Sequence, residues 1–484
     1  MADNGGSVGT AVLGAGPAGL TAAYVLGLRG APGVVYEADG IVGGIAKTVE
    51  YNGYRFDLGG HRFFTKIAQV QRLWGEVLGE ELLVRPRLSR IYFDGKYLAY
   101  PLQARDVVSR LGIVESTRCA LSYARSKMTP LRHEIETFED FVTVNFGSRL
   151  YDAFFSSYTQ KVWGIPGSEI HSEWAVQRIK DFSFWQASLA ALHLTRGKPT
   201  TLIEEFHYPR LGPGQMWEAF HSRVEEQGIP VHLNHRALTV HHVHHVVESV
   251  SVEHEGNIEG VPVDSVLSSI ALSDLVLSLD PAPPEEIVEA ARRLRYRSFC
   301  LVALVIDREE PFPDNWIYLH DPDVKAGRVQ NFGAWSPEMV RSGTTCLGVE
   351  YFCFEGDEIW DMPTDDAVAL ATDELMRIGL IAEGDVVDGV KVRVPKAYPM
   401  YVGRYREDVA ELRGYLAAFD NLKTMGRNGL HRYNNQDHSM WTAILATINL
   451  LDGAEHDVWS VNTEAEYHEE GETVSSLLDI DLVG

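Results

Sequence analysis

The first forty residues alternate short apolar runs with a glycine-rich turn and an apolar helix. Residues 11–13 form an apolar run that is typical of a buried parallel strand. A helix is predicted next, at about residues 18–28, and a second apolar strand then ends at Glu37. Three glycines separate the first strand from the helix, namely Gly14, Gly16 and Gly19. This order predicts a strand–helix–strand unit with parallel strands at the start of the chain.

The later pattern divides into a helical region and two regions of strands. Residues 73–196 are predicted to be mostly helical, except for a β-hairpin at residues 90–102 whose turn is Asp94-Gly95. Alternating apolar positions predict short antiparallel strands between residues 231 and 254. Residues 274–279 are predicted to form a further parallel strand that returns to the first sheet. Residues 296–415 alternate strands with one helix, which predicts a mixed or antiparallel sheet.

The glycine turn and Glu37 together suit a dinucleotide. The first glycine permits a tight turn, the second lets a pyrophosphate approach the backbone, and the third lets the helix pack against the strand. The free N–H groups and the dipole of the helix would face the phosphates. The carboxylate can accept hydrogen bonds from an adenosine ribose. The contacts predicted here are Gly14, Gly16, Pro17, Ala18, Gly19, Glu37 and Ala38.

A second glycine-rich region favours FAD over NAD. Gly43 and Gly44 would lie beside the first turn, and Lys47 could neutralise pyrophosphate charge. Residues 54–64 add another glycine pair, a histidine and an arginine among aromatic residues, and a flat isoalloxazine ring needs both a close backbone and apolar walls. The cofactor contacts predicted in this second segment are Gly59, Gly60, His61 and Arg62. A histidine that packs in the core and bonds a carbonyl group is an equal alternative for His61.

Near the carboxyl end, residues 434–440 supply polar N-cap residues before an apolar helix that continues to residue 451. If this helix points at the flavin, its positive end would stabilise the negative charge of the reduced ring. Plain capping of the helix explains the same residues without a cofactor. The cofactor contacts predicted in this region are Gly426, Arg427, His438, Ser439 and Met440.

We therefore predict an α/β protein with a Rossmann-like FAD-binding domain of the glutathione reductase type. A mainly helical cap and a substrate domain built on a mixed or antiparallel sheet complete it. The predicted ranges are 1–72, 206–295 and 420–460 for the FAD-binding domain, 73–205 for the cap, 296–419 for the substrate domain and 461–484 for an acidic tail.

Composition limits the partners of the chain. A net charge of −25 argues against nucleic acid, because neutralising phosphates needs clustered Lys and Arg. The four cysteines are widely spaced and show no CxxC motif, which predicts reduced thiols. The first residues do not resemble a signal peptide, and no apolar run is long enough to span a bilayer, so we expect a cytoplasmic protein. The oligomeric state stays open.

Six histidines between residues 232 and 245 could suggest a metal site. Along alternating strands their side chains would divide between two faces, and no cysteine or carboxylate stands beside them at ligand spacing. A polar sheet face is the better interpretation. We therefore predict no metal.

Three later motifs resemble one family of flavoenzymes. Residues 158–164, Tyr-Thr-Gln-Lys-Val-Trp-Gly, are similar to the Tyr-Thr-x-Lys-x-Trp-Gly motif of UDP-galactopyranose mutases, a branch of the FAD-dependent amine oxidase and protoporphyrinogen oxidase superfamily. Residues 296–298 resemble the Tyr-Arg-Ser of these mutases, whose arginine faces the substrate diphosphate and the flavin. Residues 426–433 resemble their Gly-Arg-x-Gly-x-x-x-Tyr region. The resemblance runs from about residue 10 to about residue 450.

The resemblance implies a flavoenzyme that interconverts the pyranose and furanose forms of a nucleotide-diphosphate sugar. In such enzymes N5 of reduced FAD attacks the anomeric carbon, so NAD(P)H or another reductant would be a partner. The implied catalytic residues are Arg297, Trp163, Arg178, Lys180 and His61. The substrate contacts expected from the motifs and from position are Tyr158, Trp163, Arg297, Arg328, Tyr398, Tyr401, Tyr405, Tyr433 and Asn434.

Two departures from the mutase pattern leave other reactions open. Phe182 stands where the family has a second catalytic arginine, although Lys180 could substitute, and residues 59–62 replace the family's Gly-Pro-His. One alternative is an FAD-dependent oxidase, dehydrogenase or desaturase of a sugar, an amine or an apolar substrate. Another is a non-catalytic FAD-bound scaffold whose acidic tail recruits a partner.

Overall fold

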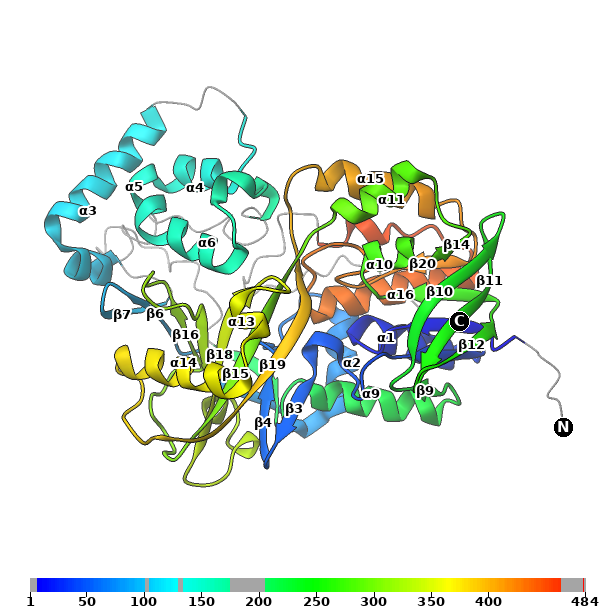
Figure 1. Cartoon of the computed structure of the whole chain (residues 1–484), viewed down its shortest axis with the longest axis horizontal. Helices are drawn as coiled ribbons and strands as arrows, with labels where there is room; N and C mark the ends of the chain where they lie inside the picture. Colours follow the sequence, from blue (N-terminus) through cyan, green and yellow to red (C-terminus); the bar gives the residue numbers. More distant parts are fainter. Residues whose placement is uncertain (1–6, 101–103, 129–133, 175–204, 463–481, 483–484) are drawn as a thin grey trace.

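A five-stranded parallel sheet contains the strand–helix–strand unit at the start of the chain (Figure 1). The computed structural model describes residues 7–100, 104–128, 134–174, 205–462 and 482. In sheet order the strands are β20 (Leu422–Thr424), β13 (Ser265–Ser268), β1 (Thr10–Leu13), β2 (Gly33–Tyr36) and β9 (Val231–His232). Neighbouring strands thus come from early, middle and late parts of the chain. The exact domain boundaries stay a prediction.

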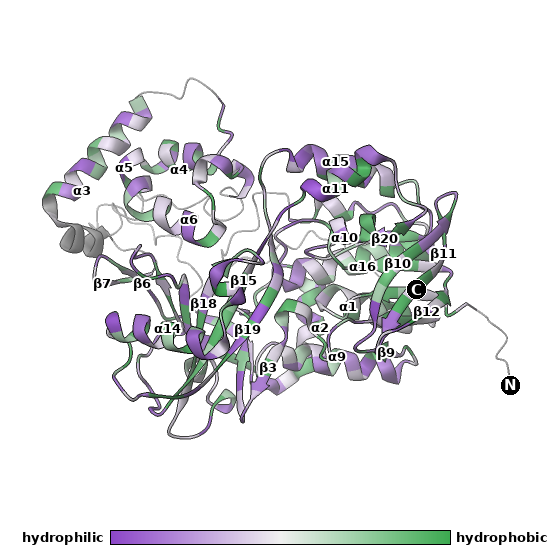
Figure 2. Cartoon of the chain, viewed as in Figure 1, coloured by the Kyte–Doolittle hydropathy of each residue, from purple (hydrophilic) through white to green (hydrophobic). Residues whose placement is uncertain are grey.

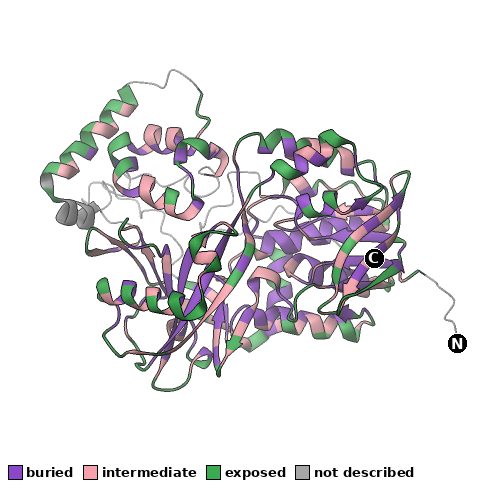
Figure 3. Cartoon of the chain, in the orientation of Figure 1, coloured by how far each residue is buried: buried purple, intermediate pink, exposed green. Residues whose placement is uncertain are grey.

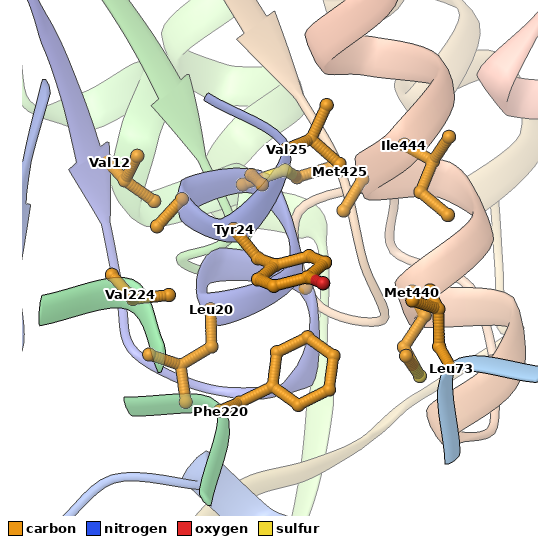
Figure 4. Packing of buried hydrophobic residues seen from close by; sticks show 14 of the residues in the cluster. Val12, Leu20, Tyr24, Val25, Leu73, Phe220, Val224, Met425, Met440 and Ile444 are labelled. Atoms are coloured by element: carbon orange, nitrogen blue, oxygen red, sulfur yellow. The ribbon is translucent and has the colours of Figure 1, made fainter. Parts of the chain in front are cut away.

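Alternation along the strands places an apolar core on each face of this sheet. Val12 and Val35 pack with four helices on one face, whereas Ala11, Leu13 and Val34 pack on the other. Figure 4 shows the first core, in which Tyr24, Phe220 and Ile444 come from three different helices. The four helices are α1 (Pro17–Leu28), α2 (Ala68–Leu78), α9 (Gly214–Glu226) and α16 (Gln436–Asp452). The core therefore joins segments that are more than four hundred residues apart.

The middle of the chain corrects one expected strand. The parallel strand that returns to the first sheet is β13, which is buried throughout. Residues 274–279 were expected in that place, but most of them belong to a short helix, α10 (Leu272–Leu277). A short apolar run suits either a buried strand or a buried helix, because periodicity alone does not separate the two. The short antiparallel strands predicted between residues 231 and 254 are confirmed for β10 (Arg236–Val243) and β11 (Val246–His254), whereas residues 231 and 232 form β9 of the parallel sheet.

A mixed seven-stranded sheet forms the second half of the molecule (Figure 1). Its strand pairs are antiparallel except for the parallel pair β16–β6. In sheet order the strands are β19 (Val386–Pro399), β15 (Tyr296–Ile306), β18 (Thr345–Cys353), β17 (Arg328–Asn331), β16 (Trp316–Leu319), β6 (Ser89–Phe93) and β7 (Lys96–Ala99). The predicted hairpin is β6–β7, and both residues of its Asp94-Gly95 turn have positive φ, as a tight primed turn needs.

Helices lie above one end of the seven-stranded sheet (Figure 1), and several of their residues line the cavity described below. They enclose an aromatic core that includes Phe138, Phe154 and Trp163. In chain order they are α3 (Ala104–Met128), α4 (Phe138–Phe146), α5 (Ser148–Leu150), a π-helical turn (Tyr151–Ser156) and α6 (Ser157–Trp163). None of the helices in the described ranges combines the length and apolar character that a bilayer span requires.

The remaining elements pack around these layers. Helix α14 lies against the seven-stranded sheet, and α15 packs beside α11 at the top of the first sheet. Apolar residues gather on the inner strands in Figure 2, and the same strands are buried in Figure 3. The remaining bounds are β3 (Thr48–Tyr51), β4 (Tyr54–Asp57), β5 (Leu82–Pro86), β8 (Glu205–Pro209), β12 (Asn257–Pro262), β14 (Leu279–Asp280), α11 (Glu285–Arg293), α12 (Phe332–Trp335), α13 (Glu358–Asp361), α14 (Thr364–Arg377) and α15 (Tyr405–Leu416). The predicted α/β fold is confirmed.

Candidate active site

One large cavity lies where the two sheets and the helical layer meet. It has a volume of about 1150 Å³, above the roughly 300–1,000 Å³ of a typical small-ligand pocket. The β1–α1 turn and the first turn of α16 line one part of it, and α6, β16 and β17 line another. The cavity thus has room for a dinucleotide and a second ligand.

The β1–α1 turn forms a cradle that side chains would fill. Gly44 has a φ of +55°, and a Cβ atom on it would stand 3.2 Å from the Cα of Gly16. Gly14 has a φ of +96°, and a Cβ there would stand 2.6 Å from Oγ of Ser269. Helix α1 begins after Gly16, where no side chain caps its first N–H groups. Such a helix N-terminus binds phosphate readily, so the residues fit the pyrophosphate of a dinucleotide.

Glu37 lies at the end of β2 and lines the same end of the cavity. One carboxylate oxygen accepts a hydrogen bond from the backbone N–H of Ala15 at 2.7 Å, and the other accepts one from Asp39 at 2.8 Å. These bonds hold the carboxylate at the position expected for a ribose contact. Ala38 also lines the cavity, and Lys47 forms an ion pair with Asp39 there.

Three predicted cofactor contacts lie behind the cavity wall. Gly19 allows α1 to approach β1, because a Cβ on it would overlap the carbonyl oxygen of Gly14. Gly43 adopts a φ of +104° that positions Gly44. Met440 does not line the cavity but is fully buried, where its sulfur accepts a hydrogen bond from Nε1 of Trp74 at 3.2 Å. These residues shape the site without forming its surface.

Helix α16 presents its first turn to the cavity, as expected, but it begins earlier than the sequence suggested. Asn435 is the N-cap, and its backbone N–H donates to Nδ1 of His438 at 3.2 Å to complete a capping box. The helix therefore starts at Gln436, and His438 and Ser439 belong to its first turn on the cavity wall. The positive end of the helix dipole faces the cavity.

The middle of the cavity carries the positive charge of Arg427, whereas the charge of Arg328 is paired with Glu350. Gly59, Gly60, His61 and Arg62 line it. Burial lowers the pKa of His61 to about 3, and the charges of Arg427 and Arg328 lower it further. The imidazole of His61 is therefore neutral at neutral pH, and the surroundings favour anions over cations.

Arg427 brings a buried guanidinium group with unused donors to the cavity. Its guanidinium carbon lies 4.1 Å from the ring centre of Tyr433 and 5.0 Å from that of Tyr398. Nη1 donates to the carbonyl oxygen of Asn434 at 3.2 Å. Nε and Nη2 are buried and have no partner among the described residues. Because an unpaired buried donor is costly, these two nitrogens are well suited to an anionic ligand.

Arg328 lies across from residues 59 and 60 and is held there by an acidic partner. Two of its guanidinium nitrogens donate to the carboxylate of Glu350 at 2.8 and 2.6 Å. The side-chain amide of Gln330 donates to the same carboxylate at 2.6 Å. A Cβ on Gly59 would stand 3.7 Å from Nη2 of Arg328. The ion pair thus fixes the direction of Arg328 at the centre of the cavity.

Helix α6 contributes the two aromatic residues of the Tyr-Thr-Gln-Lys-Val-Trp-Gly motif. Tyr158 and Trp163 both line the cavity, and Trp163 is only 3% exposed. The indole N–H of Trp163 is buried without a partner among the described residues, and its ring meets that of Tyr398 edge to face at 6.0 Å. The free N–H makes Trp163 a donor for a bound ligand.

Arg297 does not line the cavity, although it was expected to face a diphosphate there. Its guanidinium group donates to the carbonyl oxygens of Val162 at 2.9 Å and Phe352 at 3.0 Å and lies 4.2 Å above the ring of Phe354. On the other side of α6, Nζ of Lys161 donates to the carbonyl groups of Leu319, Asp321 and Ala326. Arg297 and Lys161 therefore fasten α6 to the sheet.

The other predicted substrate residues divide between the cavity and the packing behind it. Tyr398, Tyr433 and Asn434 line the cavity. Tyr401 and Tyr405 do not: their rings stack at 4.7 Å, Tyr401 accepts the backbone N–H of Tyr433, and Tyr405 donates to Glu173. Arg178, Lys180 and Phe182 lie outside the described residues.

The family model described as flavin containing amine oxidoreductase matches residues 17–431. The chain belongs to this family. It is accordingly a flavin-dependent enzyme, and its cofactor is FAD. Within the cavity, the β1–α1 cradle, Glu37 and the first turn of α16 fit this cofactor.

Solved structures share the fold of this flavin-containing amine oxidoreductase. A crystal structure of reduced UDP-galactopyranose mutase matches with a TM-score of 0.81 at 20% identity, covering 95% of this chain and 98% of that chain. A putative protoporphyrinogen oxidase from Exiguobacterium sp. 255-15 matches with a TM-score of 0.67 at 16% identity, covering 91% and 98%. A putrescine oxidase variant matches with a TM-score of 0.63 at 14% identity, covering 92% and 99%. At these identities the likeness concerns the fold.

Sequence reasoning missed part of the wall of this flavoenzyme's cavity. Trp316, Tyr318 and His320 line the cavity from β16 and the residue that follows it, and Arg87 lies 5.5 Å from the ring centre of Trp316. The sequence carries a signal for this wall, because every second residue of a strand lies on the same face of the sheet. It was overlooked because no motif surrounds it.

The histidine-rich segment of the flavoenzyme has ordinary hydrogen-bond partners. Nδ1 of His241 lies 2.9 Å from a carboxylate oxygen of Asp280, and Nε2 lies 2.7 Å from Oγ of Ser251. His235 stacks on His254 at 4.0 Å. Within the ranges that the structure describes, no three or more His, Cys, Asp or Glu residues are arranged to hold a metal ion.

Proposed function

We propose that this flavoenzyme acts on a nucleotide-diphosphate sugar and interconverts the pyranose and furanose forms of the sugar. Four of the six arginines that line the cavity support the proposal, because the chain as a whole has a net charge of −25. They are Arg62, Arg87, Arg328 and Arg427. Positive charge gathered in a cavity of an acidic protein attracts an anionic substrate, and guanidinium groups match the geometry of phosphate.

The pair of unused nitrogens on Arg427 is the single observation that carries the proposal most directly. They lie beside the aromatic rings of Tyr398 and Tyr433. A diphosphate there would supply the missing acceptors. Arg328, held by Glu350, would add a second guanidinium group. Bidentate contacts of this kind are strong in a cavity that excludes water.

The remaining side chains would orient the sugar. Reduced FAD supplies a nucleophilic nitrogen for the anomeric carbon when it is bound. Trp163 donates its free indole N–H, while Tyr158 forms an aromatic wall against which the sugar can lie. Orientation of this kind lowers the entropic barrier of a bimolecular step. The fold shared with reduced UDP-galactopyranose mutase also supports this proposal.

The positive field argues against the oxidation of an amine. A protonated amine would approach Arg328 and Arg427, and the charges of these two arginines add to the burial that keeps His61 neutral. Like charges in a buried site repel strongly. Oxidation of a neutral or anionic sugar is the second candidate, because the family includes oxidoreductases.

Activity in the two redox states of the flavin separates these candidates. The purified holoenzyme is assayed under anaerobic conditions with UDP- and dTDP-sugars, once oxidised and once reduced with dithionite. Ring isomerisation that appears only after reduction is the expected result. Bleaching of the oxidised flavin by a sugar, with formation of an oxidised product, would instead establish an oxidase or dehydrogenase. No turnover in either state, together with partner binding that needs the acidic tail, would support the scaffold alternative.

A further inference from the structure

His320 is a cavity residue whose chemistry the proposed reaction leaves unused. It follows the last residue of β16, and its imidazole stacks on the ring of Tyr158 at 3.9 Å with an interplanar angle of 9°. Lys161 donates to the carbonyl oxygens of Leu319 and Asp321, the residues on either side of His320. The imidazole therefore has a defined place on the cavity wall.

The contacts of His320 determine which ring nitrogen carries the hydrogen. Nδ1 lies 3.1 Å from the carbonyl oxygen of Phe154, and a carbonyl oxygen only accepts hydrogen bonds. Nδ1 is therefore the donor. Burial lowers the pKa of His320 to about 3, and only the contact with Phe154 opposes this, while the charge of Lys161 adds to it. The ring is neutral at physiological pH, so Nε2 keeps a lone pair.

Nε2 of His320 is a hydrogen-bond acceptor in a cavity whose other polar groups include several donors. It has no hydrogen-bond partner among the described residues, and the side chain is only partly covered. The ionisable groups that contact the ring or act on its charge are the phenol of Tyr158, against which it stacks, and the ammonium of Lys161. Elsewhere on the wall, the arginines and the indole of Trp163 offer N–H groups. An acceptor in such surroundings complements a ligand group that donates.

We propose that Nε2 of His320 accepts a hydrogen bond from an uncharged donor group of the substrate, either a sugar hydroxyl or the imide N–H of a pyrimidine base, and so determines substrate specificity. The proposal rests on the proposed function for the class of substrate. A site that accepts a hydrogen bond discriminates against a ligand that lacks the donor, because the acceptor is then covered by the ligand and left unpaired.

Two substitutions of His320 distinguish the roles of its two ring nitrogens. His320→Asn keeps an N–H group near the position of Nδ1, where it can donate to Phe154, but it removes the atom at Nε2. His320→Gln reaches further and restores an acceptor close to Nε2. His221→Asn is the control, because His221 contacts Glu225 in α9 and does not line the cavity. Flavin content and thermal midpoint are measured for every variant.

The readouts are the Kd of UDP and the KM of the nucleotide sugar for each holoenzyme. We expect His320→Asn to weaken the binding of the ligand that carries the donor by about tenfold, a typical cost of leaving the ligand's donor unpaired in the complex, and His320→Gln to recover most of this loss. A loss confined to the nucleotide sugar identifies a sugar hydroxyl as the donor. A similar loss for UDP identifies the base.

Three results would overturn the proposal. The first is an unchanged Kd and KM for His320→Asn, and the second is an equal loss for His320→Asn and His320→Gln. The third is an Asn variant without flavin, which would show that His320 supports the fold rather than the ligand. A wild-type holoenzyme that binds neither UDP nor any nucleotide sugar would instead refute the proposed function itself, which keeps the two failures distinguishable.

Discussion

At the scale of single residues, buried charge determines what the cavity can bind. Arg427 has two unused donors there, so Arg427→Met should weaken UDP binding by about 1.5–3 kcal/mol, the range for hydrogen bonds to charged groups. Calorimetric titration of the holoenzyme measures this change. Arg413→Met is the matched control, because Arg413 forms an exposed ion pair with Asp457. An unchanged affinity for UDP in Arg427→Met would remove Arg427 from the anion site.

Asp57 is a residue whose burial makes stability depend on pH. Burial raises its pKa from 3.8 to about 7, although hydrogen bonds from Tyr208 and Thr48 oppose the rise. The folded state therefore holds this proton more tightly than the unfolded state does. The stability that results is complete below about pH 4 and is lost as the pH rises through about 7.

We therefore expect the wild type to lose about 2–3 kcal/mol relative to Asp57→Asn between about pH 5 and about pH 8. Urea unfolding of both proteins at the two pH values measures the difference, and the shared contributions of other groups cancel. A pH-independent difference between the two proteins would show that Asp57 stays charged when folded.

At the scale of elements, the hydrogen bonds that hold α6 against the seven-stranded sheet matter most for the site. Arg297 binds the carbonyl group of Val162 near the end of that helix, so Arg297→Met should release the helix that presents Tyr158 and Trp163. We expect kcat/KM to fall by about tenfold or more while flavin content is unchanged, because misplaced contacts cost orientation. Steady-state kinetics of the reduced enzyme measures the fall. Arg292→Met is the control, since Arg292 pairs with Glu289 on an exposed helix face.

A different result for Arg297→Met would indicate that Arg297 binds the diphosphate. If the variant loses affinity for UDP as strongly as Arg427→Met does, while kcat is unchanged, Arg297 contacts the ligand directly. Its present carbonyl partners argue against that result.

The phosphate cradle is a second element that can be tested by itself. Gly44 and Gly30 both have positive φ, +55° and +64°, but a Cβ on Gly44 would meet the Cα of Gly16 at 3.2 Å, whereas Gly30 has open space around it. Both alanine variants therefore carry similar backbone strain. We expect Gly44→Ala to be purified with much less flavin than the wild type and Gly30→Ala to keep its flavin. The ratio of flavin to protein absorbance measures the flavin content of each variant. Equal ratios for the two variants would contradict the proposal that the turn around Gly44 binds the cofactor.

At the scale of the whole molecule, local sequence signals identified more of the cavity wall near the β1–α1 turn than near β16. The glycine turn with Glu37, and the start of the helix after residue 435, are each encoded within a short stretch of sequence. Their patterns can therefore be recognised before the fold is known. His320 and Arg87 come from strands and loops that meet only in the folded sheet. Arg297 shows the limit of a local motif. The motif identified the residue but not the direction of its guanidinium group, which points to the carbonyl group of Val162.

The cavity also depends on the arrangement of the whole chain. Its walls come from both sheets and from the helical layer. The cradle at α1 and the free nitrogens of Arg427 thereby open into one continuous space. A flavin and a diphosphate bound there would be neighbours.

Titration of UDP into the oxidised holoenzyme, followed through the visible absorbance of the flavin, tests this shared cavity most directly. A saturable shift of the flavin band is expected, and uridine alone should not cause it at the same concentrations, because the diphosphate carries the charge that the arginines bind. A yellow, folded protein whose flavin spectrum does not respond to saturating UDP, or that binds UDP without any spectral change, would contradict a site in which cofactor and nucleotide sugar meet.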